Sequence, residues 1–96
     1  MNEKQMEVLE KAVDKYGKKA QVLQAIEEMS ELTKELVKNI NRGQDNIKDI
    51  ILEIADVQIT LYELIIIYTK EDNDFGDKLL GAIEYKIQRL KKRMEV

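Results

Sequence analysis

Acidic side chains at helical spacing are the residues of this chain that could most readily do chemistry. On a helix, which advances about 100° per residue, Glu27, Glu28 and Glu31 would lie within about 100° of one another. Glu53 and Asp56 repeat the i, i+3 spacing of Glu28 and Glu31. If the two groups lie on adjacent antiparallel helices, their carboxylates converge. A cation or a proton would then be needed to offset their repulsion.

The composition restricts the kind of ion that could bind there. The chain has 96 residues and contains neither Cys nor His, which excludes the usual zinc sites, thiolate nucleophiles, imidazole bases and disulfides. Ligation by oxygen alone favours Mg²⁺ or Mn²⁺ over Zn²⁺. Four carboxylates exceed what one Mg²⁺ usually takes, so either more than one ion binds or one glutamate is free to orient or deprotonate a water. Both alternatives indicate phosphoryl-ester or anhydride chemistry.

A single all-α domain over residues 1–96, of the four-helix bundle type, is expected to position these carboxylates. Apolar residues recur at helical spacing almost throughout, and the breaks fall at Gly17, near Gly43 and within residues 70–77. Gly17 is expected to cap the C-terminus of a first helix, and the second then runs over residues 18–42. The apolar stripe expected on the second helix comprises Val22, Ala25, Met29, Leu32, Leu36 and Ile40.

The third helix is expected over residues 47–69. Asp45 or Asn46 would cap its N-terminus, and the spacing of Asn46 and Asp49 approximates a capping box. The fourth helix is expected to begin near Asp77. No period-two alternation persists, so strands are not expected.

The expected third helix carries more apolar surface than one small domain can cover. Apolar residues occupy about two thirds of its circumference. The remaining wedge holds Asp49, Glu53, Asp56, Thr60 and Glu63. Three other short helices would leave part of the apolar surface uncovered, so a second copy is expected to complete the core, as a homodimer or homotetramer.

Charge and hydropathy also bear on the partners and location of the chain. Sixteen Lys and Arg against nineteen Asp and Glu give a formal charge of −3, which does not favour binding to nucleic acid or an anionic membrane. The most apolar segment, residues 50–68, is interrupted by Glu53, Asp56 and Glu63, which argues against a membrane span. The first twelve residues are charged throughout, unlike a signal peptide. A cytoplasmic protein is expected.

The two acidic motifs also resemble those of a known family. The first reads E-E-x₂-E over residues 27–31, 21 residues separate it from the second, and the second reads E-x₂-D over residues 53–56. With their surroundings, residues 24–36 and 53–61, they look like the two motif helices of the MazG-like, all-α nucleoside triphosphate pyrophosphohydrolases. The resemblance covers about residues 20–94.

This resemblance implies a reaction, a cofactor and a set of residues. The family hydrolyses nucleoside triphosphates between the α and β phosphates with Mg²⁺, releasing the monophosphate and pyrophosphate. Carried over by position, Glu28, Glu31, Glu53 and Asp56 would be the metal ligands. Glu27 would orient a ligand or the attacking water. Glu27 and Glu31 are the candidate catalytic carboxylates, and the choice of general base stays open.

Two polar residues beside the acidic motifs are candidate substrate contacts. Gln24 lies one helical turn before Glu28, and Thr60 lies one turn after Asp56. Both would face the space between the two acidic helices. We therefore expect that either side chain could reach a bound nucleotide.

A basic strip near the end of the chain could bind the phosphates of the substrate. Lys86, Arg89 and Arg93 would share one side of the last helix, and residues 84–93 resemble the closing helix of many short MazG-like proteins. Leu90 stands where several characterised members have Asn. The plain structural interpretation is a solvated strip, since cations near a helix C-terminus suit the helix dipole.

Two other functions are compatible with the same residues. One is a non-catalytic helical module for dimerisation or regulation, whose acidic faces are simply solvated. The other keeps the fold but acts on another phosphoribosyl pyrophosphate compound, as in related histidine-pathway enzymes. Residues 57–62 match that branch less well.

Overall fold

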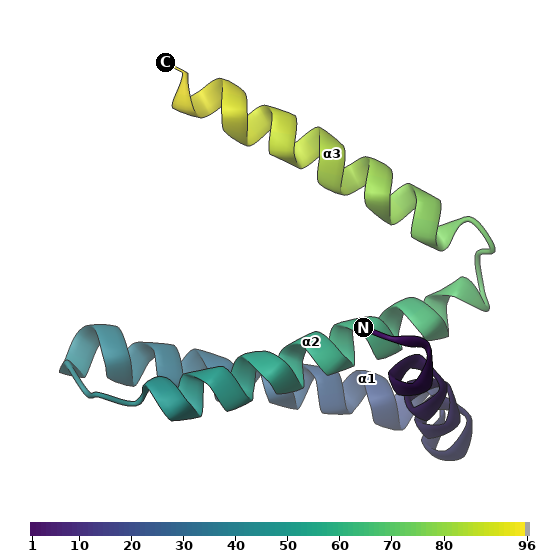
Figure 1. The fold of residues 1–96 in the computed structure, drawn as a ribbon, viewed down its shortest axis with the longest axis horizontal. Coiled ribbons are helices and arrows are strands. Elements are labelled where there is room, and N and C mark those ends of the chain that lie inside the picture. The colour runs from purple at the N-terminus through teal and green to yellow at the C-terminus, as the bar shows by residue number, and fades with distance from the viewer. Residues whose placement is uncertain (96) are drawn as a thin grey trace.

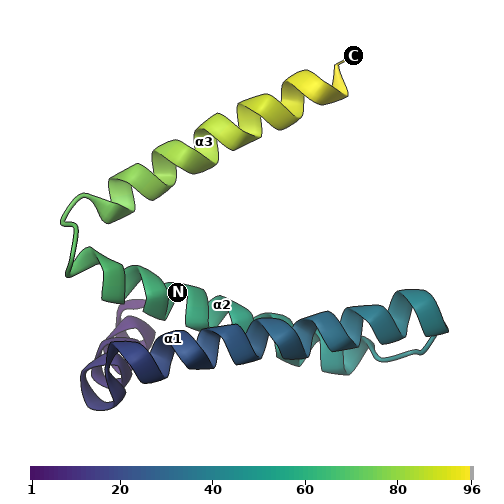
Figure 2. The same ribbon diagram turned by 180° about the vertical axis from the view of Figure 1, so that it is seen from behind.

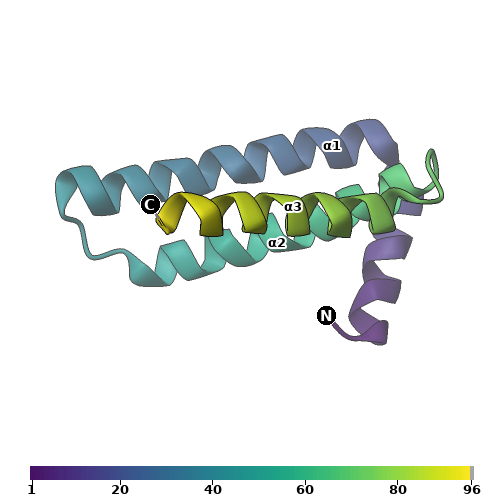
Figure 3. The same ribbon diagram turned by 90° about the horizontal axis from the view of Figure 1, so that it is seen from above.

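The computed structural model describes residues 1–95, which form three α-helices and no strand. α1 spans Glu3–Arg42, α2 spans Ile47–Thr69 and α3 spans Phe75–Met94. Helices α1 and α2 form an antiparallel hairpin, from which α3 diverges (Figures 1 and 2). Seen from above, α3 runs over the hairpin (Figure 3). The all-α prediction is confirmed. Within this described part, no helix combines the length and apolar character needed to cross a bilayer.

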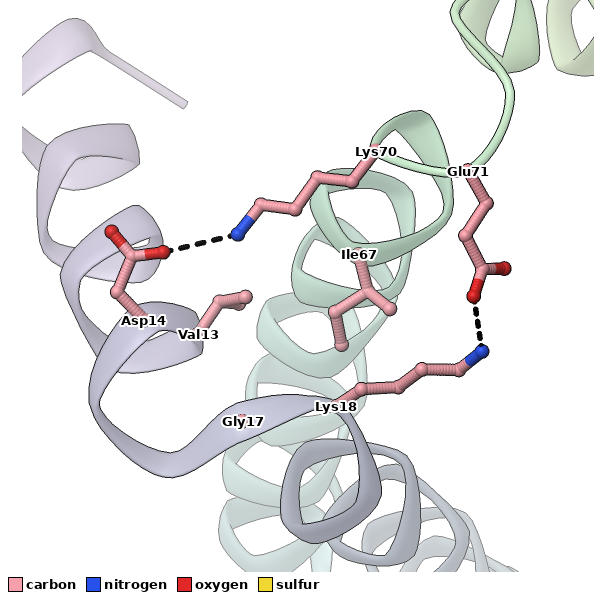
Figure 4. Close-up of a pocket in the computed structure, with 7 residues that line it drawn as sticks. All are labelled: Val13, Asp14, Gly17, Lys18, Ile67, Lys70 and Glu71. Atoms are coloured by element: carbon pink, nitrogen blue, oxygen red, sulfur yellow. Dashed lines mark hydrogen bonds and ion pairs between the residues drawn. The ribbon is translucent and has the colours of Figure 1, made fainter.

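The break expected at Gly17 is confirmed, since the backbone there is not helical. It is a kink within α1 and not the end of a separate helix, so the structure has three helices where four were expected. Gly17 has φ 84° and ψ 167°, a combination that glycine adopts far more readily than other residues. Residues 3–16, which we call the arm, thereby turn across the C-terminal end of α2. Val13 of the arm and Ile67 of α2 are both buried and line the same pocket (Figure 4).

Two ion pairs flank this crossing. Lys70 Nζ lies 3.0 Å from Asp14 Oδ1, and Lys18 pairs with Glu71 (Figure 4). The side chains involved are more than half exposed, and pairs of this kind contribute about 0–1 kcal/mol each. The two ion pairs therefore add little to the burial of Val13 and Ile67 at this crossing.

The turn between α1 and α2 is held by a buried asparagine. Gly43 ends α1, as expected, and it does so in the left-handed conformation (φ 62°). The capping box expected from Asn46 and Asp49 is wrong, since the Asn46 side chain makes no capping hydrogen bond. Instead, Asn46 Nδ2 donates to the Glu35 carbonyl (2.9 Å), and Asn46 Oδ1 accepts from Asn39 Nδ2 (3.3 Å). The side chain ties the turn back onto α1, which leaves it unable to cap α2.

The contact surface between residues 18–42 of α1 and α2, which we call the seam, mixes polar and apolar side chains. Its buried and half-buried side chains include Gln21, Ala25, Glu28, Leu32 and Glu35 on α1, and Glu53, Val57, Thr60, Glu63 and Ile67 on α2. Of the apolar stripe expected on this part of α1, Met29, Leu36 and Ile40 are exposed. The helix is rotated so that carboxylates meet α2, and much of the apolar stripe faces outward.

Residues 70–74, which we call the corner, join α2 to α3. Asp72 Oδ2 accepts from Lys78 Nζ (2.7 Å), and Asp72 Oδ1 accepts from the Asp74 backbone N–H (3.1 Å). The rings of Tyr68 and Phe75 stack across the corner with their centroids 5.9 Å apart. α3 begins at Phe75, two residues before the expected start. These contacts set the direction in which α3 leaves α2.

The Asp72 carboxylate in the corner should make the stability of the folded chain depend on pH. The hydrogen bond from Lys78, followed by that from the Asp74 N–H, lowers the pKa of Asp72 below its ordinary value of 3.8. Its stabilising effect is therefore present above that ordinary value and is lost as the pH falls through the lowered pKa. We expect Asp72→Asn to lower the melting temperature at pH 7 and to have less effect at pH 2, measured by circular dichroism.

Asp45→Asn, at an exposed loop position, is the matched control and should leave the melting temperature unchanged at both pH values. An Asp72→Asn effect of equal size at pH 7 and pH 2 would contradict the role given to the Asp72 charge.

Candidate metal centre

Three carboxylates from the two helices of the hairpin converge at the seam. One oxygen from each of Glu28, Glu53 and Asp56 lies within 4.8 Å of the other two. Glu28 belongs to α1, whereas Glu53 and Asp56 belong to α2. Glu28 and Glu53 are half-buried and Asp56 is exposed, so the group opens to solvent on one side. We call these three residues the acidic triad.

Glu53 has the least favourable environment for a charge in this group. Its pKa is raised, first by burial and then by the negative charges of Asp56, Glu28, Glu31 and Glu35. Glu53 Oε2 is shielded from solvent and accepts no hydrogen bond. A buried acceptor without a donor, surrounded by like charges, is stabilised by either a proton or a cation.

The residues present fit a hard divalent cation. The donor atoms are carboxylate oxygens only, the ligands that Mg²⁺ and Mn²⁺ prefer. Among residues 1–95, no lysine or arginine forms an ion pair with a member of the acidic triad. The protein therefore supplies no cation of its own to this group, and the triad can accept one from solution.

The other expected residues of α1 lie beside the triad in different ways. Gln24 Nε2 donates to Glu28 Oε1 at 2.6 Å and so orients that carboxylate. Glu31 Oε1 lies 3.3 Å from Lys34 Nζ, and the Glu31 charge acts on Glu53. Glu27 is exposed and lies outside the triad. Of the four expected ligands, the structure brings three together and leaves Glu31 at the edge.

Thr60 occupies the seam but does not present its hydroxyl proton to a substrate. Its side chain is 4% exposed, and Oγ1 donates to the Val57 carbonyl at 2.8 Å. The hydroxyl proton is therefore used within α2, because a threonine hydroxyl on a helix readily bonds to the preceding turn. A contact between Thr60 and a substrate stays a prediction.

Glu35 and the pair of Gln21 and Glu63 were not among the expected site residues. Glu35 Oε2 is shielded from solvent and accepts no hydrogen bond, although Lys38 Nζ lies 3.4 Å away. With its amide oriented to donate, Gln21 Nε2 lies 2.6 and 3.1 Å from the two Glu63 oxygens. Burial raises the pKa of Glu63. A helical projection of the sequence could have identified Gln21, Glu35 and Glu63, because each lies on the same face as the triad residues of its own helix.

The expected phosphate-binding residues lie on α3, apart from the triad. Lys86, Arg89 and Arg93 line one pocket together with Leu90. The Arg89 guanidinium also lies 5.8 Å from the centroid of the Tyr85 ring. Among the described residues, α3 contacts α2 but not α1. Within one chain, the structure does not bring the basic strip to the acidic triad.

Comparisons of this chain with protein-family models, with curated proteins and with solved structures find no match.

The repulsion at Glu53 predicts the effect of neutralising it. A raised pKa means that the folded protein holds the proton more tightly than the unfolded chain, so ionised Glu53 opposes folding above its unfolded pKa. In a chelating buffer, Glu53→Gln should raise the melting temperature at pH 7. The gain should shrink as the pH is lowered below 4.5, the ordinary pKa of a glutamate, because Glu53 then becomes protonated in the unfolded chain as well as in the folded protein.

Glu10→Gln, at an exposed position of the arm, serves as the control and should change the melting temperature little. A melting temperature that falls in Glu53→Gln at pH 7 without divalent ions would show that the environment of Glu53 is not repulsive.

Proposed function

We propose that this chain is a Mg²⁺-dependent nucleoside triphosphate pyrophosphohydrolase of the MazG-like type. The observation that carries the proposal is the convergence of Glu28, Glu53 and Asp56 from two helices, with a shielded and unpartnered Glu53 oxygen among them. The three residues that converge are among the four that the motif resemblance implies as ligands. The reaction joins a water oxygen to the α phosphorus and breaks its bond to the α–β bridging oxygen, so that pyrophosphate leaves.

The triad would hold the ion, with Glu31 as the fourth ligand that the resemblance implies. When bound there, Mg²⁺ would neutralise charge on the polyphosphate and polarise the phosphoryl group. Gln24 holds the Glu28 carboxylate in place through its hydrogen bond. Either Glu27 or Glu31 accepts the proton of the attacking water, because a carboxylate beside the triad can act as a general base.

The activity is tested by pyrophosphate release from a panel of ribo- and deoxyribonucleoside triphosphates with Mg²⁺. Glu53→Gln and Asp56→Asn should each lower kcat/KM by about 100-fold or more, the scale of losing one preorganised electrostatic group. Glu10→Gln, an exposed carboxylate far along α1 from the triad, should retain full activity. Equal activity in Glu53→Gln, Asp56→Asn and the parent chain would overturn the assignment of the site.

Binding of the ion can be tested without catalysis. Mg²⁺ at about 100 times its dissociation constant should stabilise the folded chain by about 2.7 kcal/mol, seen as a rise in melting temperature over a chelated sample. The rise should be much smaller in Asp56→Asn. A non-catalytic module with solvated acidic faces predicts no Mg²⁺-dependent rise in either protein.

A further inference from the structure

α3 is an amphipathic helix that its own chain leaves uncovered. None of its residues is buried, and among the described residues it contacts α2 but not α1. Its large apolar side chains fall within about 80° of one another and are all exposed, and we call them the α3 stripe: Leu80, Ile83, Ile87, Leu90 and Met94. At 1.5 Å per residue, this stripe is about 21 Å long. A long apolar stripe on a helix whose opposite face is polar is typical of helices that lie in the plane of a membrane surface.

The basic residues of the chain are concentrated on the same helix. Residues 75–94 hold six Lys and Arg against two Asp and Glu, whereas residues 1–74 hold ten against sixteen. The two acidic residues of α3, Asp77 and Glu84, lie in its N-terminal half. Residues 85–94 carry five positive charges and no negative one. The formal charge of −3 for the whole chain therefore combines an acidic hairpin with a basic α3.

Basic side chains border the α3 stripe on both sides. Lys86 and Arg93 lie next to the edge that Leu90 forms, within about 60° of it. Lys91 lies next to the opposite edge, within about 20° of Leu80. In this position a long basic side chain can lay its methylene groups along the apolar surface and place its charge among lipid headgroups. The electrostatic complement of this border is a negatively charged headgroup.

The direction of α3 keeps the acidic hairpin away from such a surface. α3 diverges from the hairpin, and the two separate further toward the C-terminus (Figures 1 and 2). The hydrogen bonds that Asp72 accepts hold the corner from which α3 leaves α2. The basic half of α3 can therefore approach a negatively charged surface without bringing the carboxylates of the hairpin to it.

We infer that α3 binds the surface of a phospholipid bilayer with anionic headgroups. The α3 stripe lies in the interfacial region of the bilayer, and the basic border lies among the phosphates. Nucleic acid would match the charges but would leave the α3 stripe in water, so the two features together favour lipid. The contact uses no residue of the acidic triad. It therefore holds or fails independently of the proposed function.

The test is co-sedimentation with phosphatidylcholine vesicles that contain about 30% phosphatidylserine, compared with vesicles of phosphatidylcholine alone. The parent chain should bind the anionic vesicles at least about tenfold more tightly than the neutral ones, because the basic border adds an electrostatic attraction. Added salt should weaken the binding, since it screens the charges.

Two variants separate the apolar and electrostatic parts of the contact. Ile87→Gln keeps the charge of α3 but removes part of the α3 stripe, and should weaken binding to anionic vesicles about tenfold. Lys91→Gln combined with Lys92→Gln should weaken it by about fivefold for each charge removed. All three positions are exposed, so the helix content measured by circular dichroism should not change.

Matched controls make the same changes elsewhere in the chain. Ile40→Gln removes an exposed isoleucine from α1. Lys4→Gln combined with Lys11→Gln removes two exposed positive charges from the arm. Both control proteins should bind the anionic vesicles like the parent chain.

A parent chain that does not bind the anionic vesicles, or that binds the neutral ones equally well, would overturn the inference. So would unchanged vesicle binding in Ile87→Gln, because charge alone would then account for the contact. Binding to single-stranded DNA without binding to vesicles would assign α3 to nucleic acid instead. A stable dimer in sedimentation equilibrium, again without vesicle binding, would assign the α3 stripe to a second copy of the chain.

Discussion

Repulsion between carboxylates in the seam opposes the packing of α1 against α2. Glu53 is approached by four other carboxylates, and burial further disfavours its charge. The seam is nevertheless held at both ends. Val13 and Ile67 are buried where the arm crosses α2, and Asn46 ties the opposite turn to the Glu35 carbonyl. Both ends of the hairpin are thus held together, while the carboxylates between them repel one another. A hard cation bound among these carboxylates would reduce that repulsion.

The same packing explains the apolar surface of the molecule. When carboxylates occupy the side of each helix that faces its neighbour, the apolar side chains of that helix must point elsewhere. Met29 and Leu36 on α1, and Ile54 and Leu61 on α2, are therefore left exposed. The side of each helix that faces its neighbour therefore determines both the candidate metal centre and the apolar exterior.

Much of the local structure could be predicted because it depends on neighbouring residues. The bounds of α2, the left-handed cap at Gly43 and the all-α class follow from periodicity and from the properties of glycine. The convergence of Glu28 with Glu53 and Asp56 also follows, once two acidic helices are joined by a short turn. Asn46 could not be predicted in the same way. Its local spacing suggests a cap, but a carbonyl eleven residues earlier competes for its side chain.

By itself, the sequence determined the bounds of α2 and the position of the break at Gly17. It likewise determined which side chains share a face, because a helix advances by a constant angle per residue. It also determined that any metal here would be bound by oxygen, because no Cys or His is present. Only the tertiary structure decided which face of each helix turns inward, how Gly17 directs the arm, and that α3 carries Lys86, Arg89 and Arg93 away from the triad. Periodicity relates residues within one helix, whereas the rotation and direction of whole helices depend on contacts between residues far apart in the chain.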